Sequence, residues 1–254
     1  MSKSSPLVEV APDHDTLAAA VAARSIAVLC DALAARPEAH FCLTGGSIGT
    51  ASLAAIAASP ACAAVDWARV HIWWSDERFE PTGDPVRNET GARAALLDQV
   101  ALTASHVHPM PASGGRWAND VDAAAAAYAD ELLRVGLGAV PDFDVLLLGV
   151  GPDGHVASLF PAHAALADLR VTCGVINSPK PPPTRITFTL PTIARAREVW
   201  LVASGAEKSE AMGRALNDGE ASLLPAALVR GSTRTLALLD REAAVHVAPV
   251  APVA

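Results

Sequence analysis

The sequence predicts an α/β fold with a mainly parallel sheet flanked by helices. Short apolar runs alternate along the chain with segments of helical periodicity, which is typical of strands joined by crossover helices. Most of these runs end in glycine or in charged residues. Because ligands bind outside the carboxyl ends of the strands in open α/β sheets, we expect the loops that follow the strands to form the functional site.

The composition argues against several classes of function. The 254 residues carry a formal net charge of −8 and no cluster of Lys or Arg, so nucleic acid is not an expected partner. No uninterrupted apolar run approaches the roughly 18–20 residues of a membrane helix, and the N-terminus lacks the apolar core of a secretory signal. The four cysteines form no CxxC pair and lie in apolar surroundings, so we expect free thiols and a cytoplasmic location.

The first half of the chain is expected to hold four strands and four helices. The first helix has a broad apolar face, and Pro37 ends it. Asn88 is a favourable N-cap for the third helix. The predicted strands are 7–10, Ala39–Leu43, Val70–Trp74 and 106–110, and the predicted helices are 16–36, 51–58, 89–97 and 117–135.

The second half continues the alternation of strands and helices. Two of its strands follow proline-containing segments, and the apolar run at 145–148 reads as a strand buried on both faces. The predicted strands are 145–148, 171–176, 185–190, Glu198–Ala203 and 235–239, with short helices near 163–169 and 191–196 and a longer one ending at 216. The tail 246–254 is expected to be frayed.

The loop 143–161 carries the chemistry that organises the rest of the chain. Glycines and Pro152 force a tight turn after the buried strand, and Asp153 and His155 lie inside it. A histidine and an aspartate at this edge of a sheet are candidates for proton transfer. The alternative is a turn in which the aspartate bonds its own backbone and the histidine is an ordinary surface residue.

Two earlier loops can bind an anion or a sugar hydroxyl. The segment 44–50, TGGSIGT, joins a strand to a helix as in a phosphate cradle, although it is neither GxxxxGK[ST] nor GxGxxG. In SDERF, Arg78 can fork onto a phosphate, and Asp76 can bond a hydroxyl or polarise a water. An ordinary turn and a solvated loop with an Asp–Arg pair are the alternatives.

Two later loops add cations. The stiff segment SPKPPPTR holds Lys180 and Arg185, and 204–208 ends in Lys208. Either lysine could also be a solvated surface residue.

Together the loops suit a phosphorylated, hydroxyl-rich small molecule and one proton-transfer step. Attack by water is favoured because no GxSxG nucleophile is present. His106 and His108 lack a carboxylate or cysteine at ligand spacing, so no metal site is expected there.

Taken together, LTGGS, SDERF with a following DPxxN, LLLGVGPDGHVASLFP, SPKPPPTRIT and GAEK closely resemble the glucosamine-6-phosphate isomerase/6-phosphogluconolactonase family. The resemblance covers roughly residues 10–240 and implies a single domain, 1–254, with a Rossmann-like fold of the NagB/RpiA/CoA transferase-like type. The motifs point to the lactonase branch, which hydrolyses 6-phospho-D-glucono-1,5-lactone to 6-phospho-D-gluconate in the second step of the oxidative pentose phosphate pathway. No metal or organic cofactor is implied.

The resemblance also implies roles for individual residues. His155 matches the general base that activates water, and Asp153 matches the acid that orients and polarises it. Asp76 and Asn88 match positions near the sugar, although Arg87 and Glu89 flank the asparagine where the family commonly has small polar residues. The residues that match the phosphate-binding parts are Gly45, Gly46, Ser47, Arg78, Lys180 and Arg185.

Two rival functions remain. An amino-sugar-phosphate deaminase would need a carboxylate shortly after His155, whereas VASLFP leads to no acid before Asp168. A sugar-phosphate sensor would need an output module, and no basic helix-turn-helix segment precedes residue 40. We therefore expect a sugar-phosphate lactone as the partner, no nucleic acid and no membrane, and a monomer or weak homo-oligomer.

Overall fold

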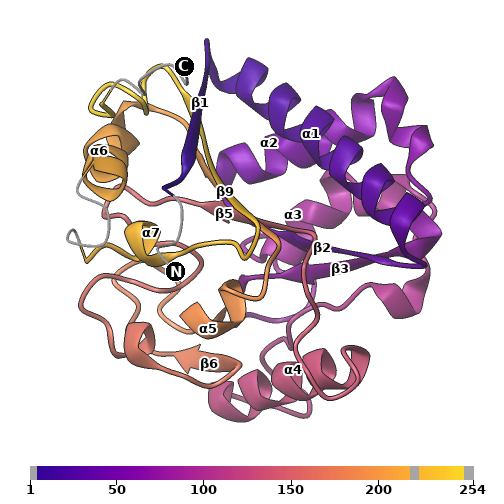
Figure 1. The fold of residues 1–254 in the computed structure, drawn as a ribbon. Helices are drawn as coiled ribbons and strands as arrows, with labels where there is room; N and C mark the ends of the chain where they lie inside the picture. Colours follow the sequence, from indigo (N-terminus) through magenta and orange to yellow (C-terminus); the bar gives the residue numbers. More distant parts are fainter. Residues whose placement is uncertain (1–4, 218–222, 249–254) are drawn as a thin grey trace.

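The computed structural model describes residues 5–217 and 223–248, and a six-stranded parallel sheet forms their centre (Figure 1). Its strand order is β1-β9-β8-β5-β2-β3, with every neighbouring pair parallel. The strands are β1 (Leu7–Ala11), β2 (Ala39–Leu43), β3 (Val70–Trp74), β5 (Val145–Gly149), β8 (Glu198–Ala203) and β9 (Arg234–Asp240). The predicted fold class is confirmed, and the carboxyl ends of all six strands meet at one edge.

Helices cover both faces of this sheet. In Figure 1, α1 and α2 lie on one side, and α4 and α5 lie on the other. The helices are α1 (His14–Ala35), α2 (Gly46–Ala58), α3 (Asn88–Ala95), α4 (Val121–Val135), α5 (Leu190–Ile193), α6 (Ser209–Asn217) and α7 (Pro225–Leu228). Short 3₁₀ turns are η1 (Pro60–Ala64), η2 (Trp67–Arg69), η3 (Leu97–Gln99), η4 (Ala104–His106), η5 (Ala164–Ala167) and η6 (Ala206–Lys208).

A second, smaller sheet lies on the α4 side. It contains β4 (Asp76–Arg78), β7 (Arg185–Phe188) and β6 (Thr172–Val175) in the order β4-β7-β6, and both pairs are antiparallel. The predicted strand 185–190 therefore exists, but it pairs here and not in the parallel sheet. This sheet brings the end of β4 next to the proline-rich segment before β7, because Arg78 pairs with Arg185 and the backbone N–H of Phe79 donates to the carbonyl of Thr184.

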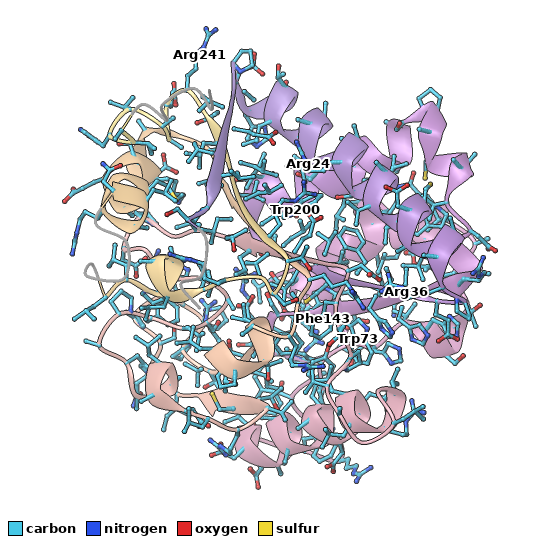
Figure 2. All side chains as sticks on the ribbon, viewed as in Figure 1. Arg24, Arg36, Trp73, Phe143, Trp200 and Arg241 are labelled. Carbon is cyan, nitrogen blue, oxygen red and sulfur yellow. The ribbon has the colours of Figure 1, made fainter. Side chains whose placement is uncertain are left out.

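Successive residues of the central strands point into two hydrophobic cores. Leu147 of β5 and Trp200 of β8 belong to the core beneath α1 and α2, whereas Leu146 of β5 and Trp73 of β3 belong to the core on the α4 side (Figure 2). The ring of Phe143 lies edge-on to Trp73 with centroids 6.2 Å apart. The alternation follows from the two-residue period of a strand, and burial on both faces explains the continuous apolar run that predicted β5.

The helix α1 is long and apolar enough to cross a membrane by length and composition, with a mean hydropathy of 1.8 over its most apolar window. Half of that window is buried inside the fold. Its buried residues include Leu17, Val21 and Leu29, which pack in the core beneath α1 and α2. The helix therefore covers the sheet in this structure.

One predicted strand is wrong. His106 ends η4, and within the described residues, 106–110 pair with the sheet only through an isolated bridge between Val107 and Ile72. Pro109 has no N–H and cannot extend a ladder, so pairing stops after one bridge.

Other predicted elements differ mainly in their bounds. The helix predicted over 117–135 begins at Val121, because Asp120 caps it by accepting a hydrogen bond from the backbone N–H of Ala123 at 2.9 Å. In the tail, residues 249–254 lie outside the described residues. The carbonyl of His246, at the start of that tail, accepts a hydrogen bond from Asn217 at 2.8 Å.

Candidate active site

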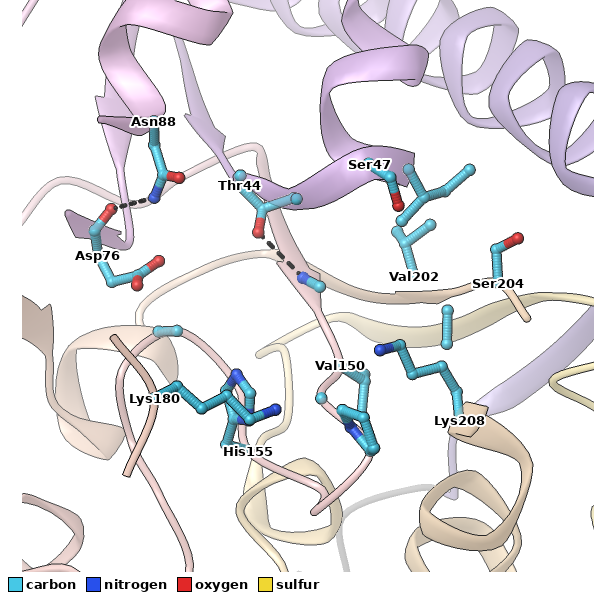
Figure 3. A pocket seen from close by; sticks show the side chains of 18 of the residues that line it. Thr44, Ser47, Asp76, Asn88, Val150, His155, Lys180, Val202, Ser204 and Lys208 are labelled. Atoms are coloured by element: carbon cyan, nitrogen blue, oxygen red, sulfur yellow. Dashed lines mark hydrogen bonds between the residues drawn. The ribbon is translucent and has the colours of Figure 1, made fainter. Parts of the chain in front are cut away.

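A cavity of about 250 Å³ opens at the carboxyl ends of β2, β5 and β8 (Figure 3). Gly45 and Gly46 contribute backbone to its wall. The polar side chains that line it are Thr44, Ser47, Asp76, Arg78, Asn88, His155, Lys180, Arg185, Ser204 and Lys208. All the predicted site residues therefore line one cavity except Asp153, which contacts a lining residue, His155.

The loop after β2 turns directly into α2, and the first turn of this helix faces the cavity. The helix begins at Gly46, five residues earlier than predicted, and Gly46 has a φ of +78°, which favours glycine. Among the described residues, no side chain caps this end. The backbone N–H groups of its first turn and the helix dipole therefore provide a binding site for an anion.

His155 and Asp153 form a hydrogen-bonded pair beside this anion site. The Nδ1 atom of His155 lies 2.5 Å from Oδ1 of Asp153. With the carboxylate as acceptor, the Nδ1 atom carries the proton, and the Nε2 atom is left with a free electron pair. A histidine held in this tautomer can accept a proton from water.

Glycine at position 151 makes this pair possible. A Cβ atom there would lie 2.0 Å from Nδ1 of His155 and 2.6 Å from Oδ1 of Asp153, closer than any side chain can approach. The backbone N–H of Gly151 donates to the carbonyl of His155 at 2.9 Å and closes the turn. The glycines of the loop therefore make room for the pair as well as forming the turn.

The surroundings keep His155 neutral. Burial lowers the pKa of His155 below its ordinary value of 6.5, although the hydrogen bond and charge of Asp153 oppose this effect. Burial would raise the pKa of Asp153, but its hydrogen bond to His155 and the charges of His155 and Lys180 together lower it. The pair therefore consists of a neutral imidazole and a carboxylate near pH 7.

Two cations approach the cavity from opposite sides. The Nζ atom of Lys180 lies 3.4 Å from Oδ1 of Asp153, and Lys208 extends from η6 on the other side of the cavity (Figure 3). Arg78, at the end of β4, donates to the carbonyl of Val86 at 2.6 Å. The local charge at the cavity is therefore positive despite the net charge of the chain.

Arg185 is mostly engaged with the protein itself. Its guanidinium donates to the carbonyls of Lys180, Pro181 and Pro182, each at 3.1 Å, and its side chain is only 5% exposed. The same group lies 4.0 Å from Oδ2 of Asp76. These contacts hold the proline-rich loop against the cavity and so position Lys180.

Asp76 and Asn88 lie in contact with each other on the wall of the cavity. The Nδ2 atom of Asn88 donates to the backbone carbonyl of Asp76 at 3.0 Å, and the hydroxyl of Ser158 donates to Oδ2 of Asp76 at 2.7 Å. A Cβ atom at Gly45 would lie 1.8 Å from Oδ1 of Asn88, so the loop after β2 can pass this asparagine only as glycine.

The predicted N-cap role of Asn88 is wrong. Asn88 is the first residue of α3, and the carboxylate of Glu77 accepts from the backbone N–H groups of Asn88 and Glu89 at 2.7 and 2.8 Å. The guanidinium of Arg87 lies 3.8 Å from Glu77 and 3.1 Å from Glu89 in a buried cluster. Glu77 thus performs the capping and leaves the Asn88 side chain free to contact the site.

Three lining or supporting residues, Ser204, Thr44 and Ser158, received no individual role from the sequence. Ser204 comes from the loop after β8, as does Lys208, which the sequence indicated only as a cation of the loop 204–208 through the unspecific motif GAEK. Thr44 accepts a hydrogen bond from the backbone N–H of Gly149 at 3.0 Å, and Ser158 bonds Asp76. Their short polar side chains carry no distinctive spacing, so the sequence gives no signal for them.

The fold and the site together define an α/β protein with a His–Asp pair and an anion site at the carboxyl edge of a parallel sheet. The solved structure of a protein described as devB protein superposes on this chain with a TM-score of 0.83 and is 28% identical in sequence. The superposition covers 95% of this chain and 99% of that protein. A monomeric glucosamine-6-phosphate deaminase of the NagB superfamily shares the fold at 19% identity, with a TM-score of 0.76 over 94% of this chain and 99% of its own.

The sequence comparisons define the family. The profile described as glucosamine-6-phosphate isomerases/6-phosphogluconolactonase matches residues 12–238. A 6-phosphogluconolactonase of Streptomyces coelicolor is 53% identical over 244 residues, which is 94% of each chain. The chain therefore belongs to the glucosamine-6-phosphate isomerase/6-phosphogluconolactonase family.

Proposed function

We propose that this enzyme hydrolyses 6-phospho-D-glucono-1,5-lactone to 6-phospho-D-gluconate, the second step of the oxidative pentose phosphate pathway. The observation that carries the proposal is the neutral His155, held by Asp153 at 2.5 Å beside a cationic cavity and a helix N-terminus. The similarity to a relative named 6-phosphogluconolactonase at 53% identity supports the same reaction.

In the proposed reaction the phosphate anchors the substrate. The N–H groups at the start of α2 and the cations Arg78 and Lys208 offer donors for its oxygens. Lys180 lies next to Asp153, on the side of the cavity that holds the base. The contacts of Arg185 favour positioning of the proline-rich loop over direct binding of phosphate.

Proton transfer then follows from the tautomer of His155. The Nε2 atom takes a proton from water as the water oxygen attacks the lactone carbonyl carbon. The imidazolium that forms is stabilised by the carboxylate of Asp153. When the tetrahedral intermediate collapses, the bond from the carbonyl carbon to the ring oxygen breaks, and Nε2 returns its proton to that oxygen. The product is the open-chain acid, and His155 is neutral again.

The deaminase alternative lacks its carboxylate. Asp168 is the first acid after His155, and its carboxylate accepts a hydrogen bond from Arg170 at 2.6 Å. Within the part of the chain that the structure describes, Asp168 does not line the cavity. This arrangement favours the lactonase. A cytoplasmic location and a monomeric or weakly homo-oligomeric state stay predictions.

The test is a direct hydrolysis assay on freshly prepared 6-phosphogluconolactone, with the spontaneous rate subtracted. His155→Ala should lower the enzymatic rate at least about 100-fold, because a general base typically contributes 10²–10⁴-fold. A near-wild-type rate would remove the role assigned to His155. Ammonia release from glucosamine 6-phosphate, measured on the same preparation, would instead identify a deaminase.

A further inference from the structure

A cluster of histidines lies at the other edge of the parallel sheet, away from the active site. His40 and His71 are paired in the register of β2 and β3 and stand at the amino ends of these strands. His106 at the end of η4 stacks on His71 with ring centroids 3.9 Å apart, and His108 lies 5.2 Å from His71. Trp74, at the active-site edge, comes three residues after His71 in β3, which is about 10 Å of strand.

Two carboxylates and two imidazoles of this cluster form a continuous chain. Oε1 of Glu131 lies 2.8 Å from Nδ1 of His108, and Nε2 of His108 lies 2.9 Å from Nδ1 of His71. Nε2 of His71 lies 3.4 Å from Oε2 of Glu38. This series of four side chains therefore runs from a carboxylate on α4, through two imidazoles, to a carboxylate just before β2.

This series of carboxylates and imidazoles lacks one proton. Each of its three gaps needs a cation or a proton between two acceptor atoms, and two neutral imidazoles supply only two protons. The pKa of Glu131 is lowered, first of all by hydrogen bonding to Arg134, so this carboxylate accepts from Nδ1–H of His108. The Nε2 atom of His108 then accepts from Nδ1–H of His71. The electron pair on Nε2 of His71 faces the carboxylate of Glu38.

In this arrangement the gap between His71 and Glu38 receives no proton. Nε2 of His71 is buried, and the carboxylate that faces it belongs to a side chain that is 51% exposed. The ring of His40 stacks on His71 with centroids 4.8 Å apart. The gap therefore holds two acceptors that need a cation between them.

A third acceptor turns toward the same gap. Among the described residues, Nε2 of His71 and Nδ1 of His106 are buried without a hydrogen-bond partner. One ring nitrogen of His71, one ring nitrogen of His106 and a carboxylate oxygen of Glu38 all lie within 4.8 Å of one another. Ligands about 2.0–2.1 Å from a tetrahedral metal lie about 3.4 Å apart, which is the separation of His71 and Glu38. The rings of His71 and His106 are stacked in this structure, so binding of an ion requires the His106 ring to rotate about its broad χ2 torsion until its nitrogen points at the same place.

We propose that Glu38, His71 and His106 bind a divalent transition-metal ion of the Zn²⁺ type, separate from the active site. Two imidazoles and one carboxylate are a zinc ligand set, and the exposed side of Glu38 leaves a fourth position for water. His108 and Glu131 orient His71 from behind, as the outer hydrogen bonds of metal-binding histidines do. The ion ties η4 to the amino ends of β2 and β3.

The sequence could not suggest this site. His106 and His108 are separated by one residue and have no ligand partner nearby, and Glu38 and His71 come from other elements. Only the pairing of β2 with β3 brings these groups together.

The test is equilibrium dialysis of the full chain against Zn²⁺ after treatment with a chelator, with metal quantified per chain. We expect one ion per chain with a dissociation constant of about 1 µM or tighter. Glu38→Gln and His106→Gln should weaken binding at least about tenfold, and Glu131→Gln should weaken it about 10–100-fold through His108 and His71. The side chain of Glu38 is 51% exposed, so its substitution should leave the fold intact, which circular dichroism checks.

Two controls separate this site from other histidines. His14→Gln, at a half-buried histidine at the start of α1, and His155→Gln, in the active site, should both keep the ion. Co²⁺ in place of Zn²⁺ should give the strong visible absorption of a tetrahedral ion. No binding by the wild type, unchanged binding by Glu38→Gln, loss of the ion in His155→Gln, or the weak spectrum of octahedral Co²⁺ would each overturn the proposal.

Discussion

The charge of Asp153 can be removed without removing its hydrogen bond to His155. Asp153→Asn keeps an oxygen that can accept from Nδ1–H, but it loses the carboxylate that stabilises the imidazolium during the reaction. A hydrogen bond to a charged group contributes about 1.5–3 kcal/mol. The Asp153 side chain is 36% exposed, so water screens part of this interaction, and the lower part of the range, about 1.5–2 kcal/mol, applies. At about 1.4 kcal/mol for each factor of ten, the plateau rate should fall about 10–30-fold.

The same change should move the pH profile in a defined direction. Asp153 raises the pKa of His155, so its neutralisation lets burial and the charge of Lys180 lower that pKa further. Because the neutral imidazole is the active form, the rate rises with pH through this pKa. The acid limb of the profile should therefore shift to lower pH in Asp153→Asn while the plateau falls.

The assay is initial-rate hydrolysis of fresh 6-phosphogluconolactone across a pH series, corrected for spontaneous opening at each pH. Asp168→Asn is the matched control, since Asp168 pairs with Arg170 and does not line the cavity in the described part of the chain. Asp168→Asn should leave both the plateau rate and the acid limb of the pH profile unchanged. A profile of Asp153→Asn that coincides with the wild type, or a limb that moves to higher pH, would refute the assigned pairing.

Three further substitutions test other parts of the site. Arg78→Ala should raise KM for the phosphorylated lactone about 10–100-fold and spare an unphosphorylated lactone, and equal losses on both would count against phosphate binding. Gly151→Ala should lower kcat about 100-fold or more, because its Cβ would lie 2.0 Å from Nδ1 of His155, whereas Gly91→Ala, with nothing closer than 3.8 Å, should have little effect on the rate. Arg185→Gln should lower the free energy of unfolding in urea by about 3–5 kcal/mol and raise KM, and an unchanged urea midpoint would contradict its bracing role.

Local patterns predicted the sheet and much of the site. The apolar run of β5 and the glycines after it are neighbours in sequence, so the placement of Asp153 and His155 follows from one short segment. The partners of Arg185 could not be predicted, because three carbonyls become acceptors only when the proline-rich loop has folded around the guanidinium. Glu77 was likewise missed as the cap of α3, since it lies eleven residues before the helix it caps.

The hydrogen bond from the backbone N–H of Gly149 to the hydroxyl of Thr44 joins the two functional halves of the cavity. Thr44 leads into the start of α2, where the phosphate is proposed to bind, and Gly149 leads into the loop of His155. The span between anchor and base is thus set by neighbouring strands, not by mobile loops. A fixed distance between the phosphate site and His155 selects substrates by the distance between their phosphate and their carbonyl group. A lactone whose phosphate sits one carbon nearer its carbonyl should bind at the anchor yet leave its carbonyl short of His155, so it should act as an inhibitor of the enzyme and not as a substrate.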